Sequence, residues 1–165
     1  MRSSQQQDEL QLSPTLLAPV ALLSSHLTFL QHTVPSTTVT ALYRVVAARI
    51  ADHILQRHIL PRGRGRISSS NGALLRAECE LWAQTCRSAL AKEPAARVEA
   101  PWRRLLQVGR ALGAEGEAWA KVRSATFGAL DDLAWAEKMN EVLGVSELER
   151  EEMAQVLRLR ADCNF

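Results

Sequence analysis

Residues 62–73 read RGRGRISSSNGA, a basic segment with three glycines that lies between two stretches of helical periodicity. The apolar residues before it follow one face of a helix from about residue 37 to residue 60. They are Val39, Leu42, Tyr43, Val46, Ile50 and Ile54. The residues after it that repeat the pattern are Leu75, Cys79, Trp82, Cys86 and Leu90. A short polar connection between two amphipathic helices predicts that they pack as antiparallel neighbours.

The same periodicity predicts helices along the rest of the chain. The further segments are 14–34, 101–112, 117–127, 130–143 and 146–160, and the helix after the hinge is expected to end before Pro94. Gly144 is expected to close one helix, while Ser146 and Glu149 have the spacing of a capping box for the next. Alternating strand patterns are nearly absent. We therefore predict an all-α bundle of six to seven helices in one domain, residues 13–165, after a disordered leader, residues 1–12.

The composition is that of a folded globular protein, and the charge is distributed unevenly along the chain. Hydrophobic residues make up 47% and charged residues 23% of the 165 residues, which argues against global disorder. Residues 1–110 carry a formal charge of +7 and residues 111–165 a charge of −5. This gradient either steers charged partners to different ends or draws the two ends together within the fold.

Side chains that carry catalysis or bind metals are present but scattered. His26 and His32 lie six residues apart and His53 and His58 five apart, so neither pair shares one face of an α-helix at i, i+4 spacing. No Walker lysine, nucleophile elbow or zinc-protease motif occurs. We therefore predict no catalytic, cofactor or metal site, and a protein that is not an enzyme.

Two other residue types fit a structural role. The three cysteines have no C-x-x-C spacing and are predicted to be buried free thiols; they are Cys79, Cys86 and Cys163. The four tryptophans fall one to a helix, as core residues do, at Trp82, Trp102, Trp119 and Trp135.

The most apolar stretch, residues 15–30, is too short and too polar to span a bilayer, and no basic segment precedes it as in a signal peptide. These features predict a cytoplasmic protein.

Several short sequences together resemble the C-terminal region of the RINT/TIP family. They are Leu12-Ser13-Pro14, Leu22 to Leu27, Leu42-Tyr43-Arg44, Ile54-Leu55, Ile59-Leu60, Arg66-Ile67-Ser68, Gly72-Ala73, Glu78 and Leu81-Trp82. The family's most recognisable stretch is an Arg-Phe-Ser turn followed by Gly-Ala and an acidic residue. Here Ile67 replaces the phenylalanine and Glu78 is the acid.

The resemblance implies a role in membrane traffic. RINT/TIP proteins are helical-rod subunits of the Dsl (NRZ) tethering complex at the endoplasmic reticulum, where they capture Golgi-derived vesicles and bind SNARE proteins. Members are several times longer than this chain, so the resemblance implies the C-terminal fragment of a longer rod. The expected function is a non-catalytic binding module with SNAREs and other tethering subunits as partners and no small-molecule substrate. Its expected location is cytoplasmic, peripheral at the endoplasmic reticulum membrane through these partners.

Two charged surfaces are candidates for binding a partner. The favoured one is basic and consists of Arg44, Arg49, Arg57, Arg62, Arg64 and Arg66. The other is acidic and consists of Asp131, Asp132, Glu137 and Glu141. An alternative function is that of a small basic helical protein that binds nucleic acid through the RGRGR loop. The three arginines of this loop also fit a solvated turn, and nucleic acid is the less favoured partner.

Overall fold

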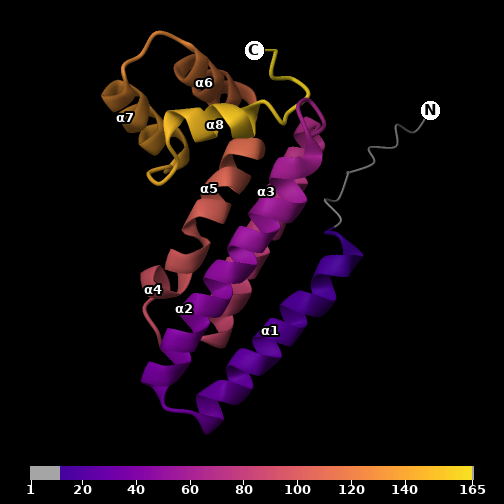
Figure 1. The fold of residues 1–165 in the computed structure, drawn as a ribbon, viewed down its shortest axis with the longest axis vertical. Coiled ribbons are helices and arrows are strands. Elements are labelled where there is room, and N and C mark those ends of the chain that lie inside the picture. The colour runs from indigo at the N-terminus through magenta and orange to yellow at the C-terminus, as the bar shows by residue number, and fades with distance from the viewer. Residues whose placement is uncertain (1–11, 165) are drawn as a thin grey trace, which may run out of the picture.

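The computed structural model describes residues 12–164, where all regular elements are helical apart from one isolated β-bridge (Figure 1). The α-helices are α1 (Pro14–Thr33), α2 (Ser36–His53), α3 (Ser69–Ala89), α4 (Ala95–Glu99), α5 (Arg103–Leu112), α6 (Gly116–Phe127), α7 (Asp132–Leu143) and α8 (Arg150–Leu157). Short helices of other types are η1 (Ile54–Ile59), η2 (Leu60–Arg62) and η3 (Ala100–Trp102). The predicted all-α fold is confirmed. Residues 1–11 of the predicted leader lie outside the described residues.

The helices form an elongated body with a cap at one end. In Figure 1, α1, α2, α3 and α5 run along the long axis, and α6, α7 and α8 gather at the top. Helix α3 packs mainly against α5 and α1, whereas α2 packs mainly against η3 and α1. The two helices joined by the hinge were expected to be direct neighbours. Instead, each has other helices as its main packing partners.

Large aromatic side chains fill the space between α2 and α3. Trp82 and Trp102 stack with their ring centroids 5.7 Å apart. The indole N–H of Trp102 donates to the Tyr43 hydroxyl at 2.9 Å, and this hydroxyl donates to the carbonyl of Val98 at 2.5 Å. The buried polar groups of the aromatic cluster are therefore paired. All four tryptophans are at most 8% exposed, which confirms their predicted place in the core.

The hinge between η2 and α3 is held by backbone pairing with the C-terminal segment. The N–H of Gly65 donates to the carbonyl of Arg158 at 2.9 Å. Ile67 donates to Leu159 at 2.9 Å and accepts from Ala161 at 2.8 Å, which makes the one parallel bridge among the described residues. Ile67 is fully buried. The backbone here is therefore not a solvated turn, although the arginine side chains are exposed.

Glycine is required in this hinge because the chain turns sharply before it pairs. Gly63 and Gly65 have φ angles of +84° and +70°, which lie in the left-handed region that other residues rarely adopt. The alternation of arginine and glycine therefore has a conformational cause. It places three charged side chains on the outside of a fixed loop.

Helix α3 approaches α5 closely at Gly72. A Cβ atom at this position would lie 2.1 Å from the carbonyl oxygen of Leu112, the last residue of α5. Gly109 allows a second close approach, to Arg76 and Cys79 of α3. The pair Asn71-Gly72 thus lies in the first turn of α3, as predicted, and Ser68 caps this helix by accepting from the Asn71 N–H at 3.2 Å.

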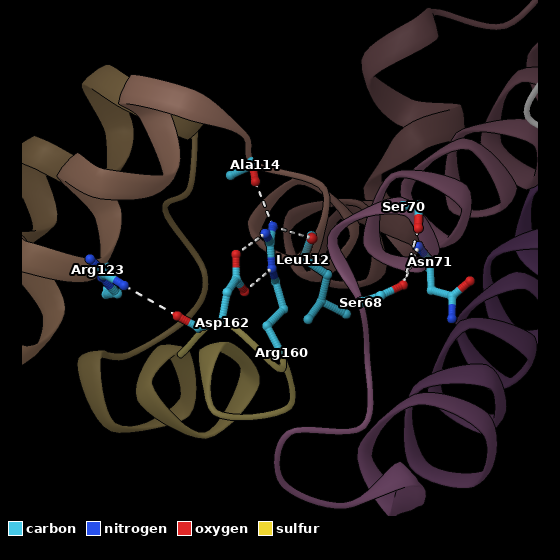
Figure 2. A network of polar contacts seen from close by, with 8 residues as sticks. All are labelled: Ser68, Ser70, Asn71, Leu112, Ala114, Arg123, Arg160 and Asp162. Carbon is cyan, nitrogen blue, oxygen red and sulfur yellow. Dashed lines mark hydrogen bonds and ion pairs between the residues drawn. The ribbon is translucent and has the colours of Figure 1, made fainter. Parts of the chain in front are cut away.

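Arg160 links the end of α5 to the C-terminal segment (Figure 2). Its guanidinium is 1% exposed and donates to the carbonyl oxygens of Leu112, at 3.0 Å, and Ala114, at 2.5 Å. It also donates to both carboxylate oxygens of Asp162 and stacks over the Trp119 ring, 4.0 Å from its centroid. A buried cation with this many partners holds α5, α6 and the C-terminal segment together.

The start of α8 differs from the prediction. The Ser146 hydroxyl does not cap the helix, because it accepts from the buried Gln107 side chain at 3.4 Å. Gln107 also accepts from the Glu147 N–H at 2.9 Å, so α5 fixes this loop. The capping box instead pairs Glu149 with Glu152, and α8 begins one residue after Glu149. The other predicted helix ends at Pro35 and Gly144 are confirmed, the latter with Gly144 in the left-handed conformation.

The charge gradient is partly neutralised within the fold. Arg103 on α5 pairs with Glu147 at 2.6 Å, and Arg104 pairs with Glu152 on α8. Basic and acidic parts of the sequence thus attract each other across the α5–α8 contact. These pairs are partly exposed, so each contributes at most about 1 kcal/mol to stability.

Replacing Gly72 with alanine tests the close approach of α3 and α5. Alanine improves helix propensity by about 1 kcal/mol, but its Cβ would clash with a backbone carbonyl that cannot move aside cheaply. We expect the clash to dominate and the free energy of unfolding to fall by about 1–2 kcal/mol, measured by urea denaturation. Asn71→Ala, one residue away and exposed, is the control and should change stability by less than about 0.5 kcal/mol. A stabilised Gly72→Ala variant would contradict the close approach.

Candidate partner-binding groove

A groove of about 720 Å³ lies between α1, the α2–η1–η2 helix and α3. Its walls are mostly apolar. The apolar side chains include Leu16, Leu22, Leu23, Ile50, Ile54, Ile59, Leu74, Leu75 and Trp82, and the polar ones include His26, His53, His58, Arg62 and Glu78. Grooves of this size and composition are typical of sites that bind small molecules or the apolar face of a helix.

Helix α1 forms the outer wall and is tied to α3 by a polar contact near each end. Near its start, the backbone N–H of Ser13 donates to the Glu78 carboxylate at 3.0 Å. Near its end, the Gln31 amide donates to the carbonyl of Ala89 at 2.7 Å. Only two side chains of this 20-residue helix are buried, Val20 and Leu27. Between its two ties, α1 therefore leaves apolar surface open along the groove.

A π-helical turn shapes the opposite wall. The predicted helix to residue 60 is α-helical only as far as His53, and η1 then follows, where the Leu60 N–H donates to the carbonyl of Leu55, five residues back. Pro61 has no N–H and cannot continue the α-helical bonding pattern. In a π-helix, residues five apart share one face. His53 and His58 consequently meet edge to face, with their ring centroids 5.4 Å apart.

This histidine pair corrects the prediction that the two side chains lie apart. In an α-helix, residues i and i+5 diverge by more than a right angle, so the five-residue spacing alone predicts no contact. The structure places both imidazoles on the groove, together with His26 from α1. The nearby Pro61 and the five-residue spacing were the only signals of this contact in the sequence.

Exposed apolar side chains extend the groove toward the α1–α2 connection. Leu22 and Phe29 are 58% and 63% exposed, and their seven-residue spacing places them on one face of α1. Leu42 and Val46 are 48% and 37% exposed and share a face of α2 with the groove residue Ile50. Both helices thus carry exposed apolar side chains in line with residues of the groove, and such side chains are common on partner-binding surfaces.

The six predicted partner-binding arginines are exposed but do not form one site. Arg62 lines the groove, and its Nε donates to the carbonyl of His58 at 2.7 Å. Arg44 lines a different hollow, of about 410 Å³, with Ser36, Thr37 and Arg97 among its neighbours. The remaining four line neither hollow; they are Arg49, Arg57, Arg64 and Arg66. Of these six arginines, only Arg62 therefore contributes charge to the groove.

The cysteines are buried free thiols, as predicted. Burial raises the pKa of Cys79 to about 12, with a further contribution from the charges of Glu78 and Glu80. Burial also raises the pKa of Cys86 to about 11. Both thiols are therefore protonated at neutral pH. Neither is a ready nucleophile, because nucleophilic attack requires the thiolate.

Residues 12–164 contain neither a metal-binding cluster nor a membrane-spanning helix. Nowhere in this part of the chain do three or more histidine, cysteine, aspartate or glutamate side chains gather as a metal site would require. None of its helices combines the length and the apolar character needed to cross a membrane.

Comparison with known proteins adds no relative. No protein-family profile, curated protein or solved structure matches the chain. The resemblance to the RINT/TIP family therefore rests on sequence positions alone.

The raised thiol pKa values predict a loss of stability at alkaline pH. Cysteine in the unfolded chain ionises near pH 9.0, while the folded thiols hold their protons up to about pH 11 or 12. The contribution of each buried thiol to stability is thus fully present below pH 9. It is lost as the pH rises from the pKa of the unfolded chain to that of the folded protein, by up to about 1.4 kcal/mol per pH unit for each thiol. Urea denaturation in reducing buffer at several pH values measures this loss. A Cys79→Ala/Cys86→Ala variant should show a shallower decline; an equal slope would contradict it.

Proposed function

We propose that this chain is a non-catalytic binding module that accepts an amphipathic helix of a partner protein in the groove beside α1. The observation that carries the proposal is the continuity between the groove and the uncovered apolar residues of α1 and α2. A helix laid along them would pack against both and complete a bundle with α3. Such helix-in-groove binding needs two parallel apolar walls about 8–10 Å from the incoming axis.

The available apolar surface sets the expected affinity. Covering the exposed half of a leucine, valine or phenylalanine contributes about 1 kcal/mol. Leu22, Phe29, Leu42 and Val46 together therefore contribute about 4 kcal/mol, and the partner's own apolar face adds a comparable amount. Association costs offset several kcal/mol of this sum. We expect dissociation constants in the micromolar range, which correspond to about −8 kcal/mol.

The resemblance to the RINT/TIP family supplies the class of partner. We infer that the module acts in a tethering complex at the endoplasmic reticulum and binds SNARE proteins or neighbouring subunits in Golgi-to-ER transport. SNAREs present long amphipathic helices, which suits the shape of the groove. The quoted motif has an architectural role here, since Ile67 is buried, Gly72 touches Leu112 and Glu78 holds the start of α1.

The second hypothesis is nucleic-acid binding through Arg62, Arg64 and Arg66. The exposure of these three side chains on a loop with a paired backbone favours it. Salt separates the two functions, because affinity for nucleic acid falls steeply with ionic strength, whereas docking of an apolar helix face changes little.

Binding of purified cytosolic SNARE segments, measured by fluorescence anisotropy, tests the proposal. At least one segment should bind with micromolar affinity. Leu22→Glu/Phe29→Glu should weaken this binding at least about tenfold, a loss of about 1.4 kcal/mol, because charge is placed on the apolar wall. Both side chains are more than half exposed, so the variant should fold normally, as circular dichroism would verify.

Leu133→Glu is the matched control, since Leu133 is 74% exposed on α7, away from the groove. It should bind like the unaltered protein. Failure of every SNARE segment to bind, or equal weakening by the α1 and α7 variants, would contradict the proposal. Salt-sensitive binding of RNA that is lost on replacing the three loop arginines with serine would favour the second hypothesis.

A further inference from the structure

The groove carries a cluster of histidine and arginine side chains that the apolar surface alone does not explain. His53 and His58 are in contact on the α2–η1 wall, Arg62 follows from η2, and His26 faces them from α1. Among residues 12–164, Glu78 from α3 is the one acidic side chain that lines the groove, and it already accepts a hydrogen bond from the Ser13 N–H. Its charge is thus partly committed to holding α1.

The geometry of the histidine pair is compatible with an anion bound against both rings. Two imidazoles 5.4 Å apart repel each other when both are protonated, and Arg62 adds to this repulsion. A carboxylate placed against the pair removes the repulsion and accepts hydrogen bonds from protonated rings. The Nδ1 atom of His26 already lies 2.9 Å from the carbonyl of Leu22, which leaves its Nε2 for a ligand on the other side.

We propose that the groove selects an amphipathic helix with carboxylates flanking its apolar face, and that one carboxylate docks against the His53–His58 pair. This inference rests on the proposed function and adds the chemistry of the partner. Histidine ordinarily changes charge between about pH 5 and pH 8. Binding of an acidic helix therefore strengthens as the pH falls through that range, until the carboxylates of the ligand are themselves protonated.

The probe is a designed helical peptide of about five turns, with leucines on one face and glutamates on both flanks. A second peptide has glutamine in place of each glutamate. The glutamate peptide should bind about three- to tenfold more tightly at about pH 5.8 than at about pH 7.5, as expected for one or two partly exposed ion pairs. The glutamine peptide should bind with the same affinity at both pH values.

Variants of the protein assign the effect to the pair. His53→Gln/His58→Gln should bind the glutamate peptide equally at both pH values and should still bind the glutamine peptide. His32→Gln is the matched control, because His32 is exposed on α1 and does not line the groove, and it should keep the pH dependence. Titration of the peptide itself is the same in every case, so it cancels in this comparison.

The outcomes separate the two proposals. Binding of both peptides without pH dependence would overturn the acidic partner but leave helix docking in place. A pH dependence that survives undiminished in His53→Gln/His58→Gln would overturn the assignment of the carboxylate to the pair. Should neither peptide bind at either pH, docking in the groove is overturned, and the acidic partner with it. Loss of the pH dependence in His32→Gln would also overturn the assignment.

Discussion

The carbonyl of Leu112 is the point on which the packing of this protein depends. Gly72 lets the first turn of α3 rest against this carbonyl, and buried Arg160 donates to it from the C-terminal segment. One backbone group thus joins α3, α5 and the end of the chain. Because the same C-terminal segment pairs with Ile67, the hinge that leads into α3 is fixed as well. The direction of α3 follows from this junction.

Because one side of α3 packs against α5, the other side of α3 faces α1, which covers it only partly. The outer helix is tied near its ends by Ser13–Glu78 and Gln31–Ala89, and one row of leucine and valine side chains packs on the core while its other side is exposed. On the opposite wall of the groove, the helix that begins as α2 continues past His53 as a π-helix, in which each backbone hydrogen bond spans five residues instead of four. A rigid inner layer and a lightly held outer helix are the combination expected for a surface that accommodates another helix.

Periodicity was sufficient to predict the longer helices, though not the five-residue α4, together with the buried tryptophans and the free thiols, because each depends on local spacing and apolar burial. It could not predict contacts between distant segments. The pairing of Ile67 with the C-terminal residues and the engagement of Ser146 by Gln107 arise only when the chain is folded. The histidine pair was missed because a π-turn changes which residues share a face. Of the six predicted arginines, only Arg62 lies in the groove.

Amide hydrogen exchange tests most directly whether α1 and η1 form the partner-binding wall. In the unbound protein, amides of α1 should exchange much faster than those of α3 and α5, since α1 buries two residues whereas α3 buries six and α5 seven. Addition of a SNARE segment that binds should slow exchange in α1 and η1 and leave α7 unchanged. Protection of α1 equal to that of α3 before binding, or protection that appears on α7 instead, would contradict this account.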